Sequence, residues 1–399
     1  MPSKSFEVQV APAVMKWARE SAGRTIEDTA KRLGVNESLV VDWEKKKKSP
    51  TIHQLRELAK YYQRPLDAFL LYEPPIEPSS PQDFRKFSNG RGLNLHSETK
   101  FALRKARRLQ TIAKELKGPF PKDAFYKIGK VDLSNDPELL AAQFRDFLGI
   151  KSQAQVNWRK SDVLKNWVRL IESAGVIVIQ ISMPIEDARA FSLIGDGYPI
   201  IALNRTDFQN GRIFSLFHEI GHILLNKEGI CDTSSNPLIQ KSKVEKFCNH
   251  FAGAFLVPKD DLLDYLQVNS LNNKPEWSED ALRSMAKEFK VSEEVVLRRL
   301  LFFDFTSKEF YSQKRKEWAI REEQLQKAKQ KKEEERKKED KQRRGGSNIA
   351  RDCIQQNGVP IVSLILESYY DNRLNKYDIA NYLEVNLKHL PKIEKALWS

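Results

Sequence analysis

Two histidines and a glutamate, His218, Glu219 and His222, lie within five residues of one another. Histidines four residues apart project from the same side of a helix, and the mostly apolar residues 213–225 predict a helix that is buried on its opposite side. In the pattern H-E-x-x-H, two neutral imidazoles bind one zinc ion and the carboxylate takes a proton from a water molecule. The alternative interpretation is a chance match in a helix with two ordinary surface histidines.

A zinc ion that performs catalysis needs a third protein ligand and an open fourth position. Residues 244–257 predict a second buried helix, and Pro258 marks its end. Glu245 and Asn249 lie one turn apart on one edge of this helix, so the carboxylate can reach the metal while the amide orients a neighbouring ligand. His250 lies about 140° around the helix from Glu245, and we interpret it as structural or solvent-facing. Alternative third ligands follow the second histidine closely in sequence: Glu228, Cys231 and Asp232.

The length of 399 residues predicts two to four domains, because single cores rarely grow beyond about 250 residues. No apolar run approaches the ~20 residues of a membrane helix, and the N-terminus lacks a signal-peptide segment, so we expect no membrane association. The three cysteines form no C-x-x-C pair, which favours a reducing, cytoplasmic location. The net charge of +13 favours a polyanionic partner such as nucleic acid, although a charged surface also serves solubility.

Residues 12–72 predict five short helices around a small apolar core. Thr25 and Asn36 can cap two of these helices, and Gly34 makes the turn between them. The segment 1–75 carries 13 Lys or Arg and 10 Asp or Glu, so it is only weakly basic. Most of the positive charge of the chain must therefore lie elsewhere.

A proline-rich linker, residues 73–81, precedes a strongly basic helix at residues 97–117. The span 85–130 holds 13 Lys or Arg against three Asp or Glu, which is most of the net charge. A stripe of cations interleaved with apolar residues suits binding to a nucleic-acid backbone. A solvated amphipathic helix that bridges two domains is the alternative. The cations of the stripe are Arg104, Lys105, Arg107, Arg108 and Lys114.

Three β-rich runs precede the histidine helix and predict a small antiparallel sheet: 175–181, 188–194 and 199–204. Four helices are expected around them, near 136–148, 161–174, 278–289 and 292–303. The third run is our candidate for an edge strand that binds an extended peptide. Tyr198, at its head, could donate a hydrogen bond to a tetrahedral oxyanion, although an aromatic residue at a strand start more often serves packing.

The chain is almost wholly polar from Ser312 to Arg344, which predicts a long exposed helix or partial disorder. Gly345-Gly346-Ser347 then forms a flexible joint. Helical periodicity returns over residues 349–399, a module that shows no set of catalytic residues. We interpret this module as an interaction or dimer element. The sequence therefore divides into five segments: 1–74, 75–130, 131–305, 306–347 and 348–399.

The segment that carries the histidines resembles the ImmA/IrrE family of metallopeptidases over roughly residues 135–305. The similarity rests on His218-Glu219-Ile220-Gly221-His222, on Glu245-x-x-Cys248-Asn249-x-Phe251-Ala252 and on Leu256-Val257-Pro258. It implies a predominantly α, α+β fold with a gluzincin-like zinc site, in which manganese is the alternative metal. His218, His222 and Glu245 would be the ligands, Glu219 the catalytic base and Asn249 the residue that orients a ligand. Family members often have Ala where this chain has Cys248.

The N-terminal segment resembles XRE-type helix-turn-helix domains, most clearly in Trp43-Glu44-x-x-x-x-Ser49-Pro50 and Leu55-x-x-Leu58-Ala59. The resemblance implies that the helix near 36–45 enters the major groove of DNA. Many relatives have Gly where Lys46 stands, so the left-handed helix end is costly here or built differently. Glu37 and Asp42 would place negative charge near the DNA phosphates, so the alternative is a module for protein docking or dimerisation. The candidate DNA contacts are Asn36, Glu37, Ser38, Val41, Asp42, Lys45, Lys46, Lys47 and Lys48.

Together these features predict a zinc-dependent endopeptidase coupled to a DNA-binding domain, which binds a double-stranded DNA operator. The family resemblance implies few protein substrates, such as a helix-turn-helix repressor cleaved in a stress, phage-defence or mobile-element response, or the protein's own N-terminal segment. A toxin encoded nearby is a further candidate partner, single-stranded DNA on the basic helix is a candidate activator, and we expect a homodimer. The alternative hypothesis is a DNA-binding regulator, or the antitoxin-like member of a toxin-antitoxin pair, with a structural or inactive metal site.

Overall fold

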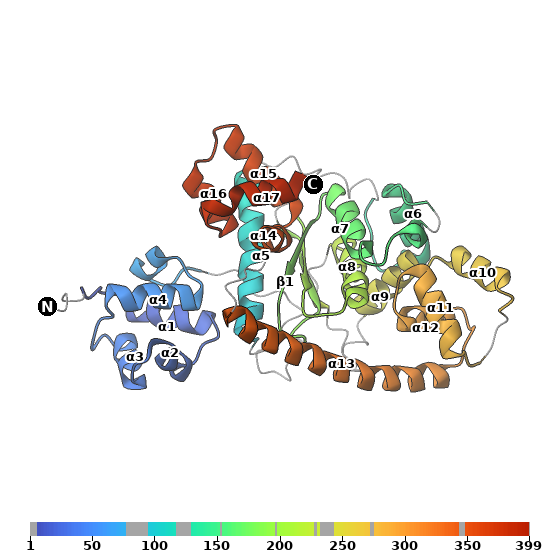
Figure 1. Ribbon diagram of the computed structural model, residues 1–399, viewed down its shortest axis with the longest axis horizontal. Coiled ribbons are helices and arrows are strands. Elements are labelled where there is room, and N and C mark those ends of the chain that lie inside the picture. The colour runs from blue at the N-terminus through green and yellow to red at the C-terminus, as the bar shows by residue number, and fades with distance from the viewer. Residues whose placement is uncertain are drawn as a thin grey trace. The chain divides into compact units, whose positions relative to one another are not determined.

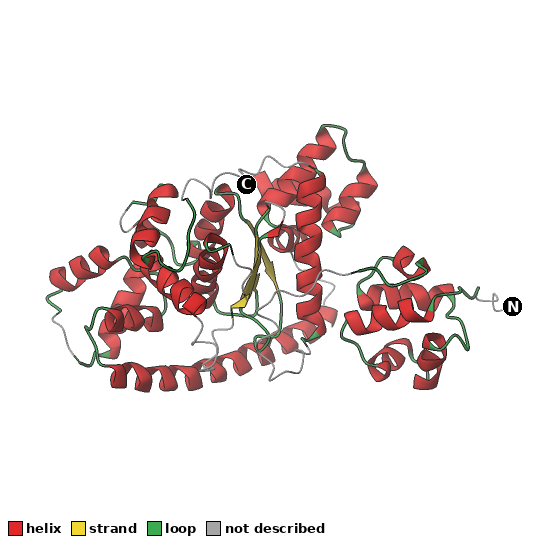
Figure 2. Cartoon of the chain, turned by 180° about the vertical axis from the view of Figure 1, so that it is seen from behind, coloured by secondary structure: helices red, strands yellow, loops and turns green. Residues whose placement is uncertain are grey.

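The computed structural model describes residues 6–76, 95–116, 129–151, 154–195, 198–226, 230–231, 243–271, 275–342 and 348–398. The chain forms two compact units, one made of Met1–Arg107 with Ser182–Asp187 and the other of Arg108–Ile181 with Ala188–Ser399. Helices dominate the described residues, and one small sheet lies in the second unit, as Figure 2 shows. The prediction of a predominantly α, α+β protein is confirmed. No helix in these ranges is long and apolar enough to cross a membrane.

The first unit begins with a bundle of four α-helices and a 3-10 helix: α1 (Pro12–Ser21), α2 (Ile26–Leu33), α3 (Glu37–Glu44), α4 (Ile52–Tyr62) and η1 (Leu66–Leu70). The predicted fifth helix is thus the 3-10 segment. Thr25 caps α2 in a capping box with Asp28, and Gly34 ends it in the left-handed conformation. Asn36 then caps α3. The sequence therefore specifies the turn between α2 and α3 at both helix ends.

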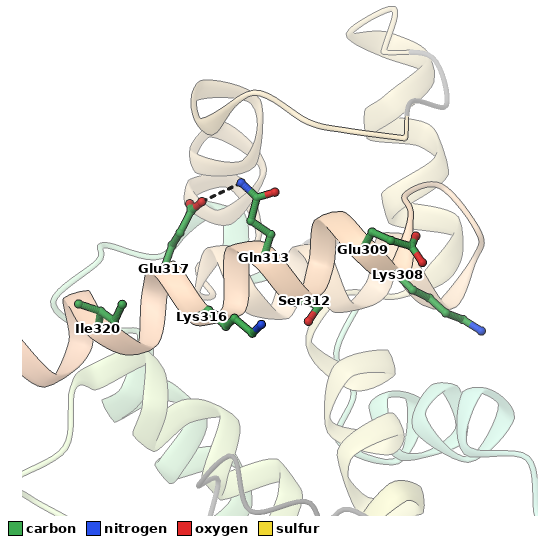
Figure 3. A pocket seen from close by; sticks show the side chains of 7 residues that line it. All are labelled: Lys308, Glu309, Ser312, Gln313, Lys316, Glu317 and Ile320. Atoms are coloured by element: carbon green, nitrogen blue, oxygen red, sulfur yellow. Dashed lines mark hydrogen bonds between the residues drawn. The ribbon is translucent and has the colours of Figure 1, made fainter.

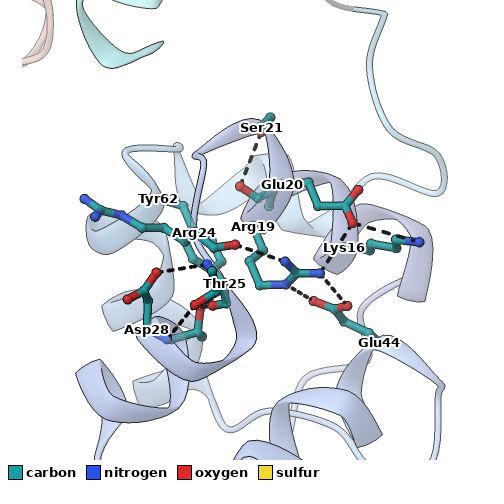
Figure 4. A network of polar contacts seen from close by, with 11 residues as sticks. Lys16, Arg19, Glu20, Ser21, Arg24, Thr25, Asp28, Glu44 and Tyr62 are labelled. Carbon is teal, nitrogen blue, oxygen red and sulfur yellow. Dashed lines mark hydrogen bonds and ion pairs between the residues drawn. The ribbon is translucent and has the colours of Figure 1, made fainter. Parts of the chain in front are cut away.

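A polar network fixes α3 against α1 (Figure 4). Arg19 on α1 donates to Glu44 through both Nε, at 2.6 Å, and Nη2, at 3.0 Å, and both side chains are nearly buried. Such a bidentate pair sets the relative angle of two helices as well as their distance. A buried hydrogen bond of 2.9 Å between the hydroxyls of Thr29 and Tyr62 links α2 to α4 in the same way. The helix bundle is therefore held by directional contacts as well as by its apolar core.

The sheet of the second unit consists of β1 (Ile177–Ile181), β2 (Ala190–Leu193), β3 (Ile200–Asn204) and the short β4 (Ile230–Cys231), in the order β1-β3-β2-β4. β2 is antiparallel to β3 and to β4, but β1 is parallel to β3, so the prediction of a purely antiparallel sheet is wrong. β3 lies inside the sheet, so the prediction that the third run forms an edge is also wrong. All residues of β2 and β3 are buried. Without polar alternation, their sequences carry no signal for strand direction or edge position.

Helices cover both faces of this sheet. Figure 1 shows α7 (Val163–Ser173) and α8 (Gln209–Leu224) on one side and α14 (Ile349–Asn357) on the other. α9 (Lys243–Leu256) packs on α8, and α6 (Pro137–Phe147) packs on α9. The rings of Phe217 on α8 and Phe255 on α9 stack with centroids 4.0 Å apart, and Trp167 meets Phe217 edge to face. This aromatic cluster holds together the two helices predicted to carry the metal ligands.

The remaining elements of the second unit include η4 (Ala154–Asn157), α10 (Lys259–Val268), α11 (Glu279–Phe289), α12 (Glu293–Phe302), α13 (Lys308–Gln342), α15 (Val359–Tyr370), α16 (Lys376–Leu383), η6 (Leu387–His389) and α17 (Leu390–Trp398). Among them, α11 and α12 match the helices predicted near 278–289 and 292–303, whereas α10 and the 3-10 helices were not predicted. α5 (Ser97–Glu115) spans the division between the units. The polar run forms a single long helix, α13. The predicted joint at 345–347 and most of the proline-rich linker lie outside the described residues.

The C-terminal module docks on the sheet through the start of α15. Gly358 has a φ of +79°, and a Cβ there would lie 3.1 Å from the carbonyl oxygen of Val178 on β1. The next residue, Val359, donates its N–H to the carboxyl of Glu172 at 3.2 Å. Burial raises the pKa of Glu172 to about 8, although hydrogen bonds from Val359 and Val178 oppose the shift. The module is therefore an integral part of this unit.

Candidate metal centre

The histidine helix and the glutamate helix approach each other closely at Gly221. A Cβ at this position would lie 3.1 Å from both the Cα and the Sγ of Cys248 on α9. Only a residue without a side chain allows this spacing, which brings the next histidine, His222, towards α9. His218, His222 and Glu245 are all buried or nearly so. The local sequence thus determines how far the imidazoles lie from the carboxylate.

Three donor atoms converge between α8 and α9. The Nε2 atoms of His218 and His222 are 3.1 Å apart, and each lies 3.2 Å from one oxygen of Glu245. Two ligands bound ~2.0–2.1 Å from a tetrahedral ion lie roughly 3.3 Å from each other. Two nitrogens and a carboxylate at this spacing match the donor set and size of a zinc site, so the residues present fit the implied metal.

Asn249 determines which nitrogen of His218 faces the centre. Its Oδ1 accepts a hydrogen bond of 3.1 Å from Nδ1 of His218. A ring that donates through Nδ1 has a free lone pair on Nε2, which is the form that a metal requires. Burial alone would raise the pKa of Glu245, but when the two imidazoles are protonated, hydrogen bonds and charge from His218 and His222 outweigh it and lower that pKa. The carboxylate is therefore ionised and available as a ligand.

Glu219 lies beside this cluster and is fully buried. Its Oε2 accepts a hydrogen bond of 2.6 Å from Oγ of Ser192 on β2, while its Oε1 has no hydrogen-bond partner among the described residues. Burial raises the pKa of Glu219, and positive charge on His222 and His218 opposes the shift. One oxygen is thus fixed and the other can accept a proton. Ser192 was missed by the sequence interpretation, although a lone hydroxyl in a buried apolar strand was a usable signal.

Buried arginines hold the other end of α9. Arg145 donates to the carbonyl of Phe255 at 2.8 Å, and Arg299 donates to that of Val257 at 2.9 Å. Cations at a helix C-terminus satisfy its free carbonyls and oppose its dipole. Arg299 also binds Glu138, which contacts Nε2 of His250 at 2.6 Å. His250 is therefore structural, one of the two roles expected for it.

The metal cluster opens into a cavity of about 680 Å³. His218, Glu245 and Asn249 line it beside the cluster. Side chains from α11, α12, α13 and the start of α8 line the rest, together with Lys160, Val163 and Arg189. Tyr198 is buried and does not line this cavity, so the structure does not bring the suggested oxyanion donor to it. Figure 3 shows a separate, open hollow along α13, lined by that helix alone, and none of the candidate ligands lies there. The cavity beside the histidines is thus the candidate substrate site.

Three alternative third ligands follow His222 in the sequence. Glu228 and Asp232 lie outside the described residues, and for Cys231 only the backbone is described, where it pairs with Ala190. Glu245 is the carboxylate that joins the two histidines among the residues that the structure describes.

The candidate DNA contacts cluster on and after α3. Glu37, Ser38 and the four lysines 45–48 are exposed, whereas Val41 and Asp42 are half-buried. Asn36 is occupied as the cap of α3, and Asp42 forms an ion pair of 3.5 Å with Lys48. Lys46 has a φ of +58°, so the left-handed helix end expected at this position is formed by a residue other than glycine. DNA contact by these residues remains a prediction.

Four of the five candidate cations of α5 are half-buried, and two of them bind other helices. Arg104 donates to the backbone carbonyl of Tyr62, the last residue of α4, at 2.9 Å. Arg108 donates to Glu384 at 2.6 Å and to the carbonyl of Asn381 at 2.7 Å, at the C-terminal end of α16. Lys105 and Arg107 are half-buried, and Lys114 is exposed. Two members of the predicted nucleic-acid stripe therefore also cap helices, which the sequence did not indicate.

The fold and the site together define a metallopeptidase-like domain, with an H-E-x-x-H helix and a carboxylate from a second helix, joined to a helix-turn-helix domain. The family model of the IrrE N-terminal-like domain matches residues 171–301, and a helix-turn-helix family model matches residues 15–69. The chain is thus a fusion of these two domains, as the resemblance implied. A search among curated proteins found no match.

Proposed function

We propose that this protein is a zinc-dependent endopeptidase coupled to a DNA-binding domain and that it cleaves a repressor-like regulator to control transcription. The observation that supports this most is the convergence of His218, His222 and Glu245 beside Glu219, next to a cavity. The match to IrrE N-terminal-like domains supports the same chemistry. The proposed substrate or partner is a helix-turn-helix repressor or a toxin encoded nearby. Manganese is the alternative to zinc as the bound metal.

The side chains have separate roles in this proposal. His218, His222 and Glu245 would hold a zinc ion, which would polarise the scissile carbonyl and acidify a water molecule. Glu219 takes up a proton at Oε1 and passes it to the leaving amine, while Ser192 holds Oε2. Asn249 keeps the ring of His218 in the tautomer that leaves Nε2 free. The low-dielectric surroundings strengthen each of these interactions.

The test compares wild-type protein with Glu219→Gln, using the product of the neighbouring gene as substrate. Glutamine keeps the shape of the side chain but cannot accept the proton, so metal content should be unchanged and cleavage lost. Metal is measured by elemental analysis and cleavage by mass spectrometry. Glu276→Gln, at an exposed position outside the cavity, is the matched control and should cleave normally. Unchanged cleavage by Glu219→Gln would show that the assigned base is wrong.

A DNA-binding regulator with a structural or inactive metal site is the second candidate function, and the helix-turn-helix match favours it. In that case DNA or toxin binding survives loss of the metal ligands. A gel-shift series with the double variant His218→Ala/His222→Ala separates the two functions. Operator binding that persists while no substrate is cleaved by the wild type would favour the regulator.

A further inference from the structure

The cavity beside the metal cluster combines an apolar interior with a basic rim. Phe214, Val291, Val295 and Trp318 contribute apolar surface next to His218. Arginine and lysine side chains from five segments line the remaining wall, and they outnumber the acidic side chains there. A substrate site of this composition favours a peptide with an apolar side chain near the cleaved bond and acidic side chains beside it.

Some of these cations are already paired within the protein. Arg298 forms an ion pair of 2.8 Å with Glu294, and Arg283 pairs with its neighbours Glu279 and Asp280. In contrast, Lys160, Lys287, Lys290 and Arg321 have no carboxylate within ion-pair distance among the residues that the structure describes. Two of the four, Lys287 and Lys290, lie one turn apart at the end of α11. No described carboxylate therefore neutralises these two lysines, and both line the cavity.

The cavity wall holds several carboxylates, and two of them bind one arginine of the wall. Glu322 on α13 places its Oε1 2.6 Å from Nη2 of Arg189, and Asp207 accepts from Nη1 of the same guanidinium at 2.9 Å. All three residues line the cavity. A glutamate side chain thus fits sterically and electrostatically against this surface. The same chemistry is available to a substrate carboxylate at the unpaired lysines.

We propose that Lys287 and Lys290 determine specificity for acidic peptides, by binding glutamate or aspartate side chains on one side of the scissile bond. This inference rests on the proposed peptidase function and names its substrate class. The lysines reach the substrate side chains without touching the reacting atoms. Because ion pairs at a solvent-exposed rim are individually weak and screened by salt, the expected effect of the two lysines is about tenfold in affinity at low ionic strength.

The test measures binding independently of cleavage. Full-length, metal-loaded Glu219→Gln protein is titrated into a fluorescein-labelled decapeptide with a central Leu-Leu flanked by two Glu on each side. Matched peptides carry Gln or Lys at the four Glu positions. We expect the Glu peptide to bind about tenfold more tightly than the Gln peptide, the Lys peptide to bind most weakly, and the difference to shrink in ~0.5 M salt.

Charge reversal distinguishes recognition from general damage. The double variant Lys287→Glu/Lys290→Glu should reverse the order, so that the Lys peptide binds more tightly than the Glu peptide. Lys376→Glu/Lys388→Glu is the matched control, because it changes the net charge equally at two exposed positions that do not line the cavity. This control should keep the wild-type preference. A loss of preference in the control would mean that total charge, and not the cavity rim, selects the peptide.

The outcomes separate this inference from the proposed function. If the charge preference is present but wild-type protein cleaves none of the peptides, the peptidase proposal fails and the acidic-peptide site remains. If wild-type protein cleaves all three peptides with equal kcat/KM, the inference fails alone. Equal binding of the three peptides, binding of none, or tighter binding of a 20-nucleotide single strand that displaces the Glu peptide would each overturn it.

Discussion

Replacing Gly221 by alanine is expected to damage the metal centre more than it damages the fold. The added Cβ would lie 3.1 Å from Cα and Sγ of Cys248 and 3.2 Å from its Cβ. Carbon atoms in ordinary contact are ~3.5–4.0 Å apart, so α9 must retreat from α8 by on the order of 0.5 Å. The backbone of α9 cannot avoid the contact by a rotamer change, because one of the obstructing atoms is a Cα.

The two consequences of this retreat differ in size. Overpacking a close interface costs ~1–3 kcal/mol, while alanine in place of a helical glycine stabilises by about 1 kcal/mol. The net loss of stability should therefore stay below roughly 2 kcal/mol. Glu245 is on the retreating helix, however, and metal–ligand distances tolerate only about 0.2 Å. Metal affinity should therefore fall ~10–100-fold.

The assay combines a chelator competition for zinc with thermal unfolding followed by circular dichroism. Gly253→Ala is the matched control, because this glycine is also on α9 but a Cβ there would meet only the side-chain Cδ of Arg299, at 3.3 Å. The Gly253→Ala variant should keep most of the wild-type zinc affinity. Wild-type zinc affinity in Gly221→Ala, or an equal loss in both variants, would refute the argument that close helix approach sets the ligand distances.

Three further predictions concern carboxyl groups whose pKa is shifted. Ser192→Ala removes a hydrogen bond that lowers the pKa of Glu219, so the acidic limb of the pH profile of kcat/KM should move to higher pH. The rate near that limb should fall ~10-fold while the metal content is unchanged. An unshifted profile would show that this hydrogen bond does not influence Glu219. Burial raises the pKa of Glu138, but Arg299 and His250 outweigh it and lower that pKa to about 2, so its contribution is present above pH ~4.5 and is lost as the pH falls towards 2. Glu138→Gln should therefore lower the free energy of unfolding near pH 7 by about 3 kcal/mol and flatten the acid dependence, as measured by urea unfolding at several pH values. Burial raises the pKa of Glu172 to about 8, so its pH dependence of stability is opposite to that of Glu138: stability present below pH ~4.5 is lost as the pH rises towards 8. Glu172→Gln should remove this loss. Equal alkaline sensitivity of the variant and the wild type would show that another group is responsible.

The cluster of candidate metal ligands could be predicted from sequence because each part of it is a local helical pattern. The spacing of His218 and His222 places both on one side of α8, and the apolar stripe of α9 leaves Glu245 and Asn249 on one edge. These relations need only the helical period and the assumption that both apolar faces are buried. The turn between α2 and α3 was predictable for the same reason, because the capping residues and the left-handed glycine that form it lie within a few residues of one another in the sequence.

The features that were missed depend on residues far apart in the chain. The order β1-β3-β2-β4 brings Ile177 beside Ile200, and strands buried on both faces carry no polar alternation to indicate it. The contact between Ser192 and Glu219 follows from that sheet packing on α8. Arg104 and Arg108 look like surface cations in the sequence, because their neighbours in the chain do not indicate that each binds a carbonyl at the end of a distant helix. The wall that α13 adds to the cavity was missed for the same reason.

The docking of the C-terminal module also has a consequence for synthesis of the protein. β1 ends at Ile181, and the helices that cover its outer face begin at Ile349, almost 170 residues later. At ~5–20 residues per second, a ribosome needs roughly 10–35 s to make that interval. During this time the nascent chain presents a bare apolar strand to chaperones and to other nascent chains. A messenger truncated before this point should accordingly yield a product that is degraded or aggregates instead of a smaller folded protein.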